Sequence, residues 1–340
     1  MGPLSDHLLV VTILAYLSAM LGYAAEYAFG TRGAVARVAV REPALVGAGV
    51  SGVAGGQPGG SAAPGGSAAP DGEAPAAREA PGRRGLRIPA ERWGQLGVGL
   101  TALGVLAHAA TLVTRGLAAG RVPWGNMYEF VLTVCLVGAL AWFVLLVRRP
   151  QARHLGLFVT LALVVLLGVA GMKLYTKAGP LVPALNSYWL KIHVTAAATA
   201  SGILLVGFVA AVMYLIRSGY DAGKRRFPYP LGGKMPAADV LERLTFRVHT
   251  FAFPIWTLAI ICGAIWAEAA WGRYWGWDPK ETWSFVAWVV YAGYLHARAT
   301  PSVQRTVATW IAVAGWGAMT VNLFVVNLVI VGFHSYAGVK

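Results

Sequence analysis

Long apolar runs, separated by short polar segments, follow one another along the whole chain. A helix that crosses ~30 Å of hydrocarbon needs roughly 17 to 25 mainly apolar residues. Eight runs are candidates: 8–29, 94–114, 126–147, 155–172, 192–216, 248–268, 283–297 and 306–333. The seventh is short, and its Trp283 and Trp288 indicate a helix that begins at a membrane interface. The pattern predicts an all-α, polytopic transmembrane helix bundle of about eight spans.

The segment 30–91 interrupts this pattern with glycine, alanine, proline and serine, as in GGQPGGSAAPGGSAAPDGEAP. Such a composition buries too little apolar surface to offset chain entropy, so we expect a disordered cytoplasmic linker without chemistry. The chain then divides into a first transmembrane helix at 1–29, this linker, and a seven-span core at 92–340. Because the first run lacks a basic flank and a small-residue cleavage site, we interpret it as a retained span.

Composition agrees with a membrane location and excludes other classes. Hydrophobic residues make up 57% of the chain, charged residues 12%, and the mean hydropathy is +0.60. The net charge of +14 comes from basic residues scattered between apolar runs, which argues against a nucleic-acid partner. Cys135 and Cys262 form no CxxC pair, so we expect no thiol redox chemistry from this chain.

The distribution of lysine and arginine predicts the orientation of the spans. If the N-terminus is outside, the inner loops hold 20 of the 28 basic residues, and still 12 against 8 when the linker is left out. Inner loops are enriched in basic residues, so both termini should be extracytoplasmic. His193, at the outer end of the fifth span, and His334, beyond the eighth, then lie on the outer side.

An aromatic cluster lies on the same side, in the loop between the sixth and seventh spans. Residues 266–284 read WAEAAWGRYWGWDPKETWS, and five tryptophans fall within eighteen positions: Trp266, Trp271, Trp275, Trp277 and Trp283. Tryptophans that anchor a helix at an interface are usually isolated, whereas this run is dense and interleaved with glycine and acidic residues. We therefore expect this tryptophan cluster to bind a ligand.

Haem fits the residue types on this face. A flat apolar macrocycle needs aromatic faces, and glycines let the backbone approach the ring. Its iron takes axial imidazoles from two sides, which His193 and His334 can supply. Arg273 and Lys280 are candidate partners for the propionates, and Asp278, like the neighbouring glutamate, is a candidate for shaping the loop or orienting an imidazole.

The stretch WGRYWGWDPKETWS resembles the WWD signature of haem-handling proteins, and the chain from about residue 94 onward resembles their CcsA/ResC branch of cytochrome c biogenesis proteins. In that family an external histidine flanks the signature on each side, matched by His193 and His334. Another histidine, on the helix after the signature and near the inner side, is matched by His296. The segment PWGNMYE at 123–129 is similar to the family's N-x-Y-E segment.

The resemblance implies a haem-delivery subunit of a membrane cytochrome c synthase in the plasma membrane. Haem b would be held outside by the two histidines and the loop, and then joined through its vinyl groups to the CxxCH thiols of an apocytochrome. The family's active unit includes a CcsB/ResB-type membrane protein, so we expect lyase activity only within such a complex. The residues expected to contact haem are His193, His334, Trp271, Trp275, Trp277, Asp278, Trp283 and His296.

Each residue also has a plainer interpretation. The two outer histidines could be water-exposed rim residues, the tryptophans an interfacial belt, and His296, two positions from Arg298, a cytoplasmic rim residue. His108 could be a core histidine bonded to a carbonyl, and Glu129 a structural hydrogen-bond acceptor. We interpret three histidines at predicted span ends as rim residues: His7, His154 and His249.

Two other functions compete with ligation. One is a haem exporter or carrier, similar to the CcmC branch, that binds haem without attaching it. The other is an unrelated transporter or transferase whose tryptophan loop binds lipid or sugar. A Soret band in the purified protein separates both haem functions from the third.

Overall fold

All the elements described in the structure are helical. The computed structural model describes residues 2–29, 89–181, 185–330 and 332–333; the expected linker lies almost wholly outside these residues. The main helices are α1 (Gly2–Phe29), α3 (Ala90–Ala119), α4 (Met127–Arg148), α5 (Gly156–Lys173), α6 (Tyr188–Asp221), α7 (Ala238–Trp271), α8 (Pro279–Ala299) and α9 (Arg305–Thr320). Two 3-10 turns, η1 (Pro150–Leu155) and η3 (Tyr229–Lys234), lie between them. The described residues include no strand, which confirms the all-α class.

Seven of the described helices are long and apolar enough to cross a membrane, so the chain is a multi-pass membrane protein. The seventh expected span, 283–297, coincides with α8, which has 21 residues but is not among those seven helices. This helix begins at Pro279 rather than at Trp283. The reason is local, because Asp278 and Glu281 form a capping box and proline is favoured in a first helical turn.

The last helix changes its winding near its end. α9 runs into a π-helical turn, η4 (Val321–Val325), and then into the short α10 (Val326–Leu328). The described helix therefore ends at Leu328, five residues before the expected end of the eighth span at 333. π-Helical turns inside a longer helix are often found at functional sites.

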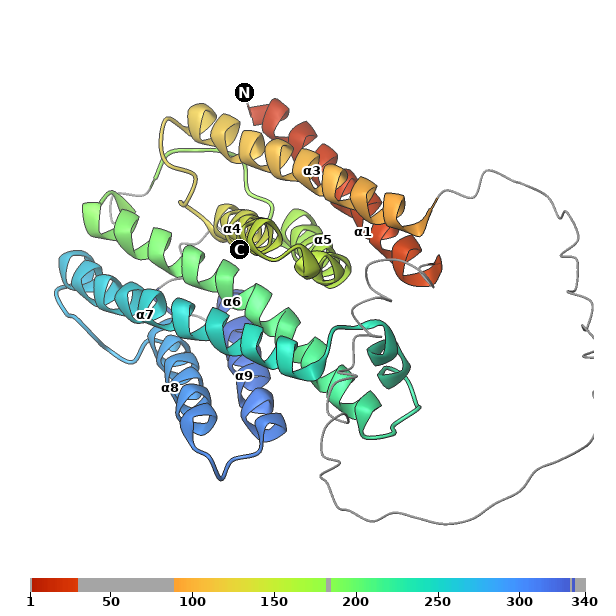
Figure 1. Ribbon diagram of the computed structural model, residues 1–340. Helices are drawn as coiled ribbons and strands as arrows, with labels where there is room; N and C mark the ends of the chain where they lie inside the picture. The colour runs from red at the N-terminus through yellow and green to blue at the C-terminus, as the bar shows by residue number, and fades with distance from the viewer. Residues whose placement is uncertain (1, 30–88, 182–184, 331, 334–340) are drawn as a thin grey trace, which may run out of the picture. The chain divides into compact units, whose positions relative to one another are not determined.

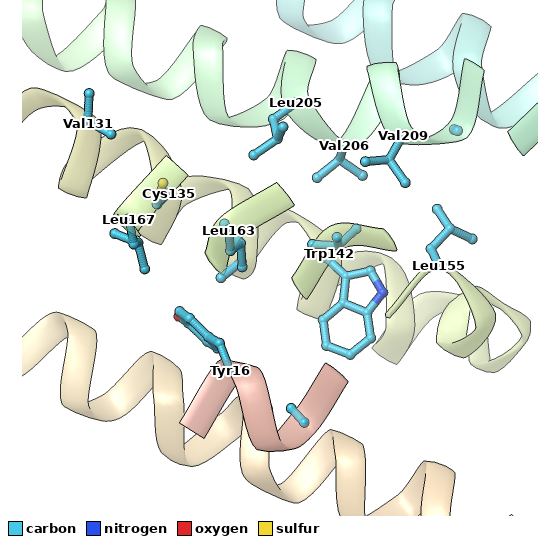
Figure 2. Close-up of a cluster of buried hydrophobic side chains, with 14 of the residues drawn as sticks. Tyr16, Val131, Cys135, Trp142, Leu155, Leu163, Leu167, Leu205, Val206 and Val209 are labelled. Atoms are coloured by element: carbon cyan, nitrogen blue, oxygen red, sulfur yellow. The ribbon is translucent and has the colours of Figure 1, made fainter. Parts of the chain in front are cut away.

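The helices pack alongside one another (Figure 1), and the two largest of the four apolar clusters among the described residues join most of them. The larger one joins α1, α4, α5 and α6, and Figure 2 shows Trp142, Leu163 and Tyr16 among its side chains. The smaller one joins α6, α7, α8 and α9. Helix α6 belongs to both, and at Gly202 a Cβ atom would lie 2.7 Å from the carbonyl oxygen of Val134, so only glycine allows α4 to approach this closely.

Successive helices run in opposite directions. At one end of the bundle, Arg115 near the end of α3 pairs with Glu129 at the start of α4, at 2.8 Å. At the other end, Arg153 before α5 pairs with Glu26 near the end of α1, at 2.6 Å. The loop 272–278 lies at the first end, where Trp275 shares a cavity with residues at the start of α4. We call this the tryptophan end of the bundle.

Candidate functional site

A cavity of about 170 Å³ opens between helices at the tryptophan end. This is far more than the ~10–15 Å³ that holds one water molecule, so the space is not a packing defect. Its walls come from the start of α4, from α6 and α7, and from α8 and the η4 turn. Most lining side chains are apolar or aromatic, and His193 and Lys280 are among the polar ones. This composition suits a flat apolar ligand that carries a few polar groups.

His193 lies in the second turn of α6 and faces α7. Its Nδ1 lies 2.7 Å from the carbonyl oxygen of Ala259. A carbonyl only accepts hydrogen bonds, so Nδ1 carries the proton, and in the neutral ring the lone pair is on Nε2. Imidazoles that ligate metals are commonly oriented by such a bond from the other nitrogen. The expected iron ligand therefore lines the cavity in the tautomer that coordination requires.

A glycine on α7 makes room for this imidazole. A Cβ atom at Gly263 would lie 2.7 Å from Cε1 of His193, closer than side chains tolerate. The imidazole also stacks on Trp266, with the ring centroids 6.3 Å apart and the planes 9° from parallel. Close approach to α7 and this stacking fix the ring in position.

The tryptophans of the loop divide into two groups. Trp266, Trp271 and Trp275 line the cavity, and the rings of Trp266 and Trp271 meet edge to face at 4.8 Å. Trp277 is 65% exposed, with a φ of +57°, and its ring meets those of Trp275 and Phe285 edge to face, at 5.7 and 6.2 Å. Trp283 packs in the smaller apolar cluster. Of the expected tryptophan contacts, Trp271 and Trp275 are therefore at the cavity, whereas Trp277 and Trp283 are not among its described lining residues.

Asp278 connects the start of α8 to the end of the described chain. Its carboxylate accepts a bond from the backbone N–H of Lys280 at 3.1 Å and another from that of Phe333 at 2.7 Å. The Phe333 ring also packs on Trp271, with centroids 5.5 Å apart. His334 itself lies outside the described residues. The residue before it is nevertheless held beside a tryptophan that lines the cavity.

Of the two basic residues of the loop, the structure places Lys280 at the cavity. Its Nζ donates to the carbonyl oxygen of Asn322 at 3.0 Å, and burial lowers the pKa of this ammonium group to about 7 while Asp278 acts in the opposite direction. Arg273 is not among the described lining residues. Its guanidinium lies over the Phe333 ring, 4.7 Å from the centroid, and 4.0 Å from a carboxylate oxygen of Glu281.

Three other histidines are not among the described residues that line the cavity. His296 is exposed on the last turn of α8, at the end opposite the loop, and does not line the cavity. His249, expected at a membrane rim, is only 1% exposed, and its ring packs against Tyr291 and Tyr294 of α8. The rim interpretation failed for His249 because α7 begins ten residues before the expected span, which moves this residue well inside the helix. His154 is likewise buried, at 6% exposure.

His108 is also buried, and its Nδ1 lies 3.4 Å from the hydroxyl of Tyr16; it is not among the described lining residues of the cavity. Sequence reasoning also missed one wall of the cavity. Trp124, Gly125 and Asn126 line it at the start of α4, whereas the sequence marks them only as a segment similar to a family motif. The signal available was the N-cap, because Asn126 accepts the N–H of Glu129 at 2.9 Å and fixes where the helix begins.

The profile of the family described as "Cytochrome C assembly protein" matches residues 124–334. "Cytochrome c biogenesis protein CcsA" of Guillardia theta is 32% identical over 257 residues, covering 71% of this chain and 85% of that protein. The protein of the same name from Synechococcus elongatus is 32% identical over 286 residues, covering 71% and 87%.

Among solved structures, "Cytochrome c Heme Lyase CcmF" superposes with a TM-score of 0.54 at 15% identity. The match covers 93% of this chain and 46% of that one, so this chain spans less than half the length of that structure. At this identity the likeness concerns the fold alone.

Proposed function

The chain belongs to the cytochrome c assembly protein family, and from this premise we propose that it binds haem b in the cavity at the tryptophan end and presents it for attachment to apocytochrome c. The observation that carries the proposal is the imidazole of His193. It lines an aromatic cavity, and its Nδ1 proton is committed to the carbonyl of Ala259 at 2.7 Å. Nε2 is then the nitrogen that coordinates the iron.

His334 is the proposed second axial ligand. Support comes from Phe333, whose N–H bonds to Asp278 and whose ring packs on Trp271. These contacts hold the chain beside the cavity one residue before His334. Asp278 is therefore a positioning residue, because it fixes both the first turn of α8 and the segment that leads to the ligand.

The proposed reaction is thioether formation with the CxxCH motif of an apocytochrome. Each cysteine thiol adds across one vinyl double bond of the haem, its sulfur bonding to one carbon and its hydrogen to the other, so no electron acceptor is required. The chain's own contribution is to orient the porphyrin by stacking on Trp271 and Trp275 and by ligation through histidine. In this proposal the chain works as a subunit of a synthase in the plasma membrane, with the loop and both termini outside.

A CcsB/ResB-type membrane protein is the proposed partner. His296 is exposed on α8, so a second membrane chain that packs there would cover its imidazole. We propose His296 as an inner haem contact formed in that complex. A buried, paired imidazole is also the usual state of a histidine that functions within a membrane.

The test is co-expression with the partner and a CxxCH reporter cytochrome, followed by an optical spectrum of the purified complex. The wild type should carry haem, seen as a Soret band, and should attach it to the reporter. His193→Gly and His334→Gly should lose attachment and alter the Soret band. His7→Gly, outside the cavity lining, is the matched control. Normal attachment by the His193 and His334 variants would refute the ligand assignment, and haem binding without attachment, even with the partner, would favour a carrier.

A further inference from the structure

Four polar side chains of the cavity lining come from the start of α8 and from the end of the last described helix. Lys280 and Ser284 come from the first two turns of α8, and Asn322 and Asn327 come from η4 and the residues after it. All four line the cavity. We call them the α8–α9 polar cluster. It faces the same space as His193 and the tryptophans, so a single ligand can meet both.

The π-helical turn builds the centre of this cluster. The carbonyl oxygen of Asn322 accepts two side-chain bonds, from Nζ of Lys280 at 3.0 Å and from Nδ2 of Asn327 at 3.1 Å. Nδ2 of Asn322 donates to the hydroxyl of Ser284 at 2.9 Å, and that hydroxyl donates to the carbonyl of Lys280 at 2.7 Å. Helices α8 and α9 are thereby joined through polar groups, which positions the ammonium group at the cavity wall.

Bonding capacity remains unused in this cluster. Lys280 uses one of its three N–H donors, and the described residues give the other two no acceptor. Oδ1 of Asn322 is buried and has no hydrogen-bond partner among the described residues. Buried polar atoms in native proteins nearly always have partners. The unused donors of Lys280 therefore indicate an acceptor on a ligand, whereas Oδ1 of Asn322, which can only accept, indicates a donor such as a water molecule.

The positive charge of Lys280 favours an anionic ligand in this cluster. Among the described lining residues, Lys280 is the sole lysine or arginine. Glu281 also lines the cavity, but one of its oxygens accepts the N–H groups of Gly276 and Asp278 at 2.8 and 3.0 Å. Asp278 in turn accepts two backbone N–H groups. Backbone donors at a helix N-terminus thus hold one oxygen of Glu281 and the carboxylate of Asp278, while Oε1 of Glu281 is buried without a hydrogen-bond partner among the described residues. The ammonium of Lys280 is the lining group that has donors to spare.

We infer that the α8–α9 polar cluster binds a carboxylate on the edge of the porphyrin, with Lys280 as the charged donor. The inference rests on the proposed haem function and adds an orientation to it. In haem b the two propionates lie on one edge of the ring and the two vinyl groups lie away from it. Holding the acidic edge against α8 and η4 directs the vinyl groups away from these helices, toward an incoming thiol.

The experiment compares two ligands, ferric haem and its dimethyl ester, in which both carboxylates are blocked. Each is titrated into the purified full-length protein from which haem has been extracted, and the dissociation constant is read from the Soret band. The wild type should bind haem roughly tenfold more tightly than the ester, as expected for a charge-assisted hydrogen bond. Lys280→Met should remove this preference and leave the affinity for the ester unchanged, whereas Lys280→Arg should retain part of it.

Lys191→Met is the matched control, because Lys191 is exposed at the start of α6 and is not among the described lining residues. It should keep the full preference for haem. Unchanged ester binding by Lys280→Met also shows that this variant is folded. A wild type without preference, or a Lys280→Met variant that keeps the preference, would overturn the inference while leaving haem binding intact. Absence of a Soret band with either ligand would instead overturn the proposed function.

Discussion

The position of one imidazole depends on three neighbours from a single helix. His193 donates to Ala259, stacks on Trp266 and fits against Gly263, all on α7. The hydrogen bond fixes the tautomer, the stacking fixes the plane of the ring, and the glycine sets the distance to the helix. A ligand for iron needs all three, since coordination depends on which nitrogen is free of its proton and where it points.

Substituting Gly263 tests this arrangement. In Gly263→Ala the new methyl group would lie 2.7 Å from Cε1 of His193, so the imidazole must move away from Ala259. We expect haem affinity to fall 10- to 100-fold, as for other losses of support to a ligand. The measurement is a Soret titration, with the spectrum reporting the loss of one axial ligand. Gly293→Ala, which meets nothing within 4 Å, should bind haem normally; a normal Gly263→Ala spectrum would contradict the prediction.

Among the elements, one buried carboxylate connects three segments at the tryptophan end. Glu129 at the start of α4 pairs with Arg115 of α3 and with Arg121 of the intervening loop, each at 2.8 Å. Both arginines continue to backbone carbonyls after α5, at Thr176 and Gly179. The structural interpretation of Glu129 therefore agrees with its contacts. The loop between α3 and α4 ends beside Trp124, so the ion pairs of Glu129 also fix the position of the cavity wall that includes Trp124.

Removing the charge of Glu129 should weaken the fold. Glu129→Gln leaves two buried or nearly buried guanidinium groups without their counter-ion, and breaking such a pair typically costs about 3–5 kcal/mol. Thermal unfolding in detergent should show a clear fall in midpoint. Asp239→Asn removes an exposed pair with Arg243 and should change stability by less than ~1 kcal/mol. Equal midpoints for the two variants would show that the buried pair contributes no more than a surface pair.

For the whole molecule, the alternation of helix directions brings the candidate site together. The ends of α3, α5, α7 and α9 meet the starts of α4, α6 and α8 at the tryptophan end. His193, the loop and Phe333 thus share one end of the bundle. Many basic residues, including Arg153 and Arg298, lie at the other. The geometry is that expected from the distribution of charge along the sequence, although the side of the membrane that each end faces stays a prediction.

Labelling with a membrane-impermeant maleimide tests that orientation. Lys191→Cys and Tyr274→Cys place thiols at exposed positions of the tryptophan end and should react in intact cells. Arg243→Cys, exposed at the other end, should react only after permeabilisation. Cys135 and Cys262 are buried, so their background should be low. Labelling of position 243 but not of 191 in intact cells would reverse the proposed topology.

The segment between α1 and α3 allows a second test at this scale. The two helices are antiparallel neighbours, and a Cβ at Gly94 would touch the carboxylate of Glu26, so Phe29 and Ala90 lie at the same end of the pair. A flexible linker of about ten residues reaches ~17 Å on average and should therefore replace residues 31–88. Haem attachment and thermal stability should stay within error of the wild type. A loss of attachment by a folded protein would show that the segment has a function of its own.

Much of the site was predictable from residue types. Apolar runs gave the spans, the density of tryptophans marked the loop, and His193 was expected at the same face as that loop. The order D-P-K-E also contains the capping box that starts α8 at Pro279, a signal that outweighs the position of the interfacial Trp283. These features depend on neighbours along the chain, so local pattern is sufficient to find them.

Other features depend on which helices become neighbours. The packing of α4, α6, α7, α8 and η4 places Lys280 at the cavity but not Arg273, and Trp271 and Trp275 but not Trp277 and Trp283. The same packing makes Trp124 part of the cavity wall and buries His249. In a membrane the apolar pattern marks a span but not the face that meets another helix, because lipid and protein are equally apolar. The sequence by itself determined the helices and the residue types that they carry. Only the tertiary structure decided which side chains share a cavity, because contacts between distant segments depend on close packing at glycines such as Gly202 and Gly263.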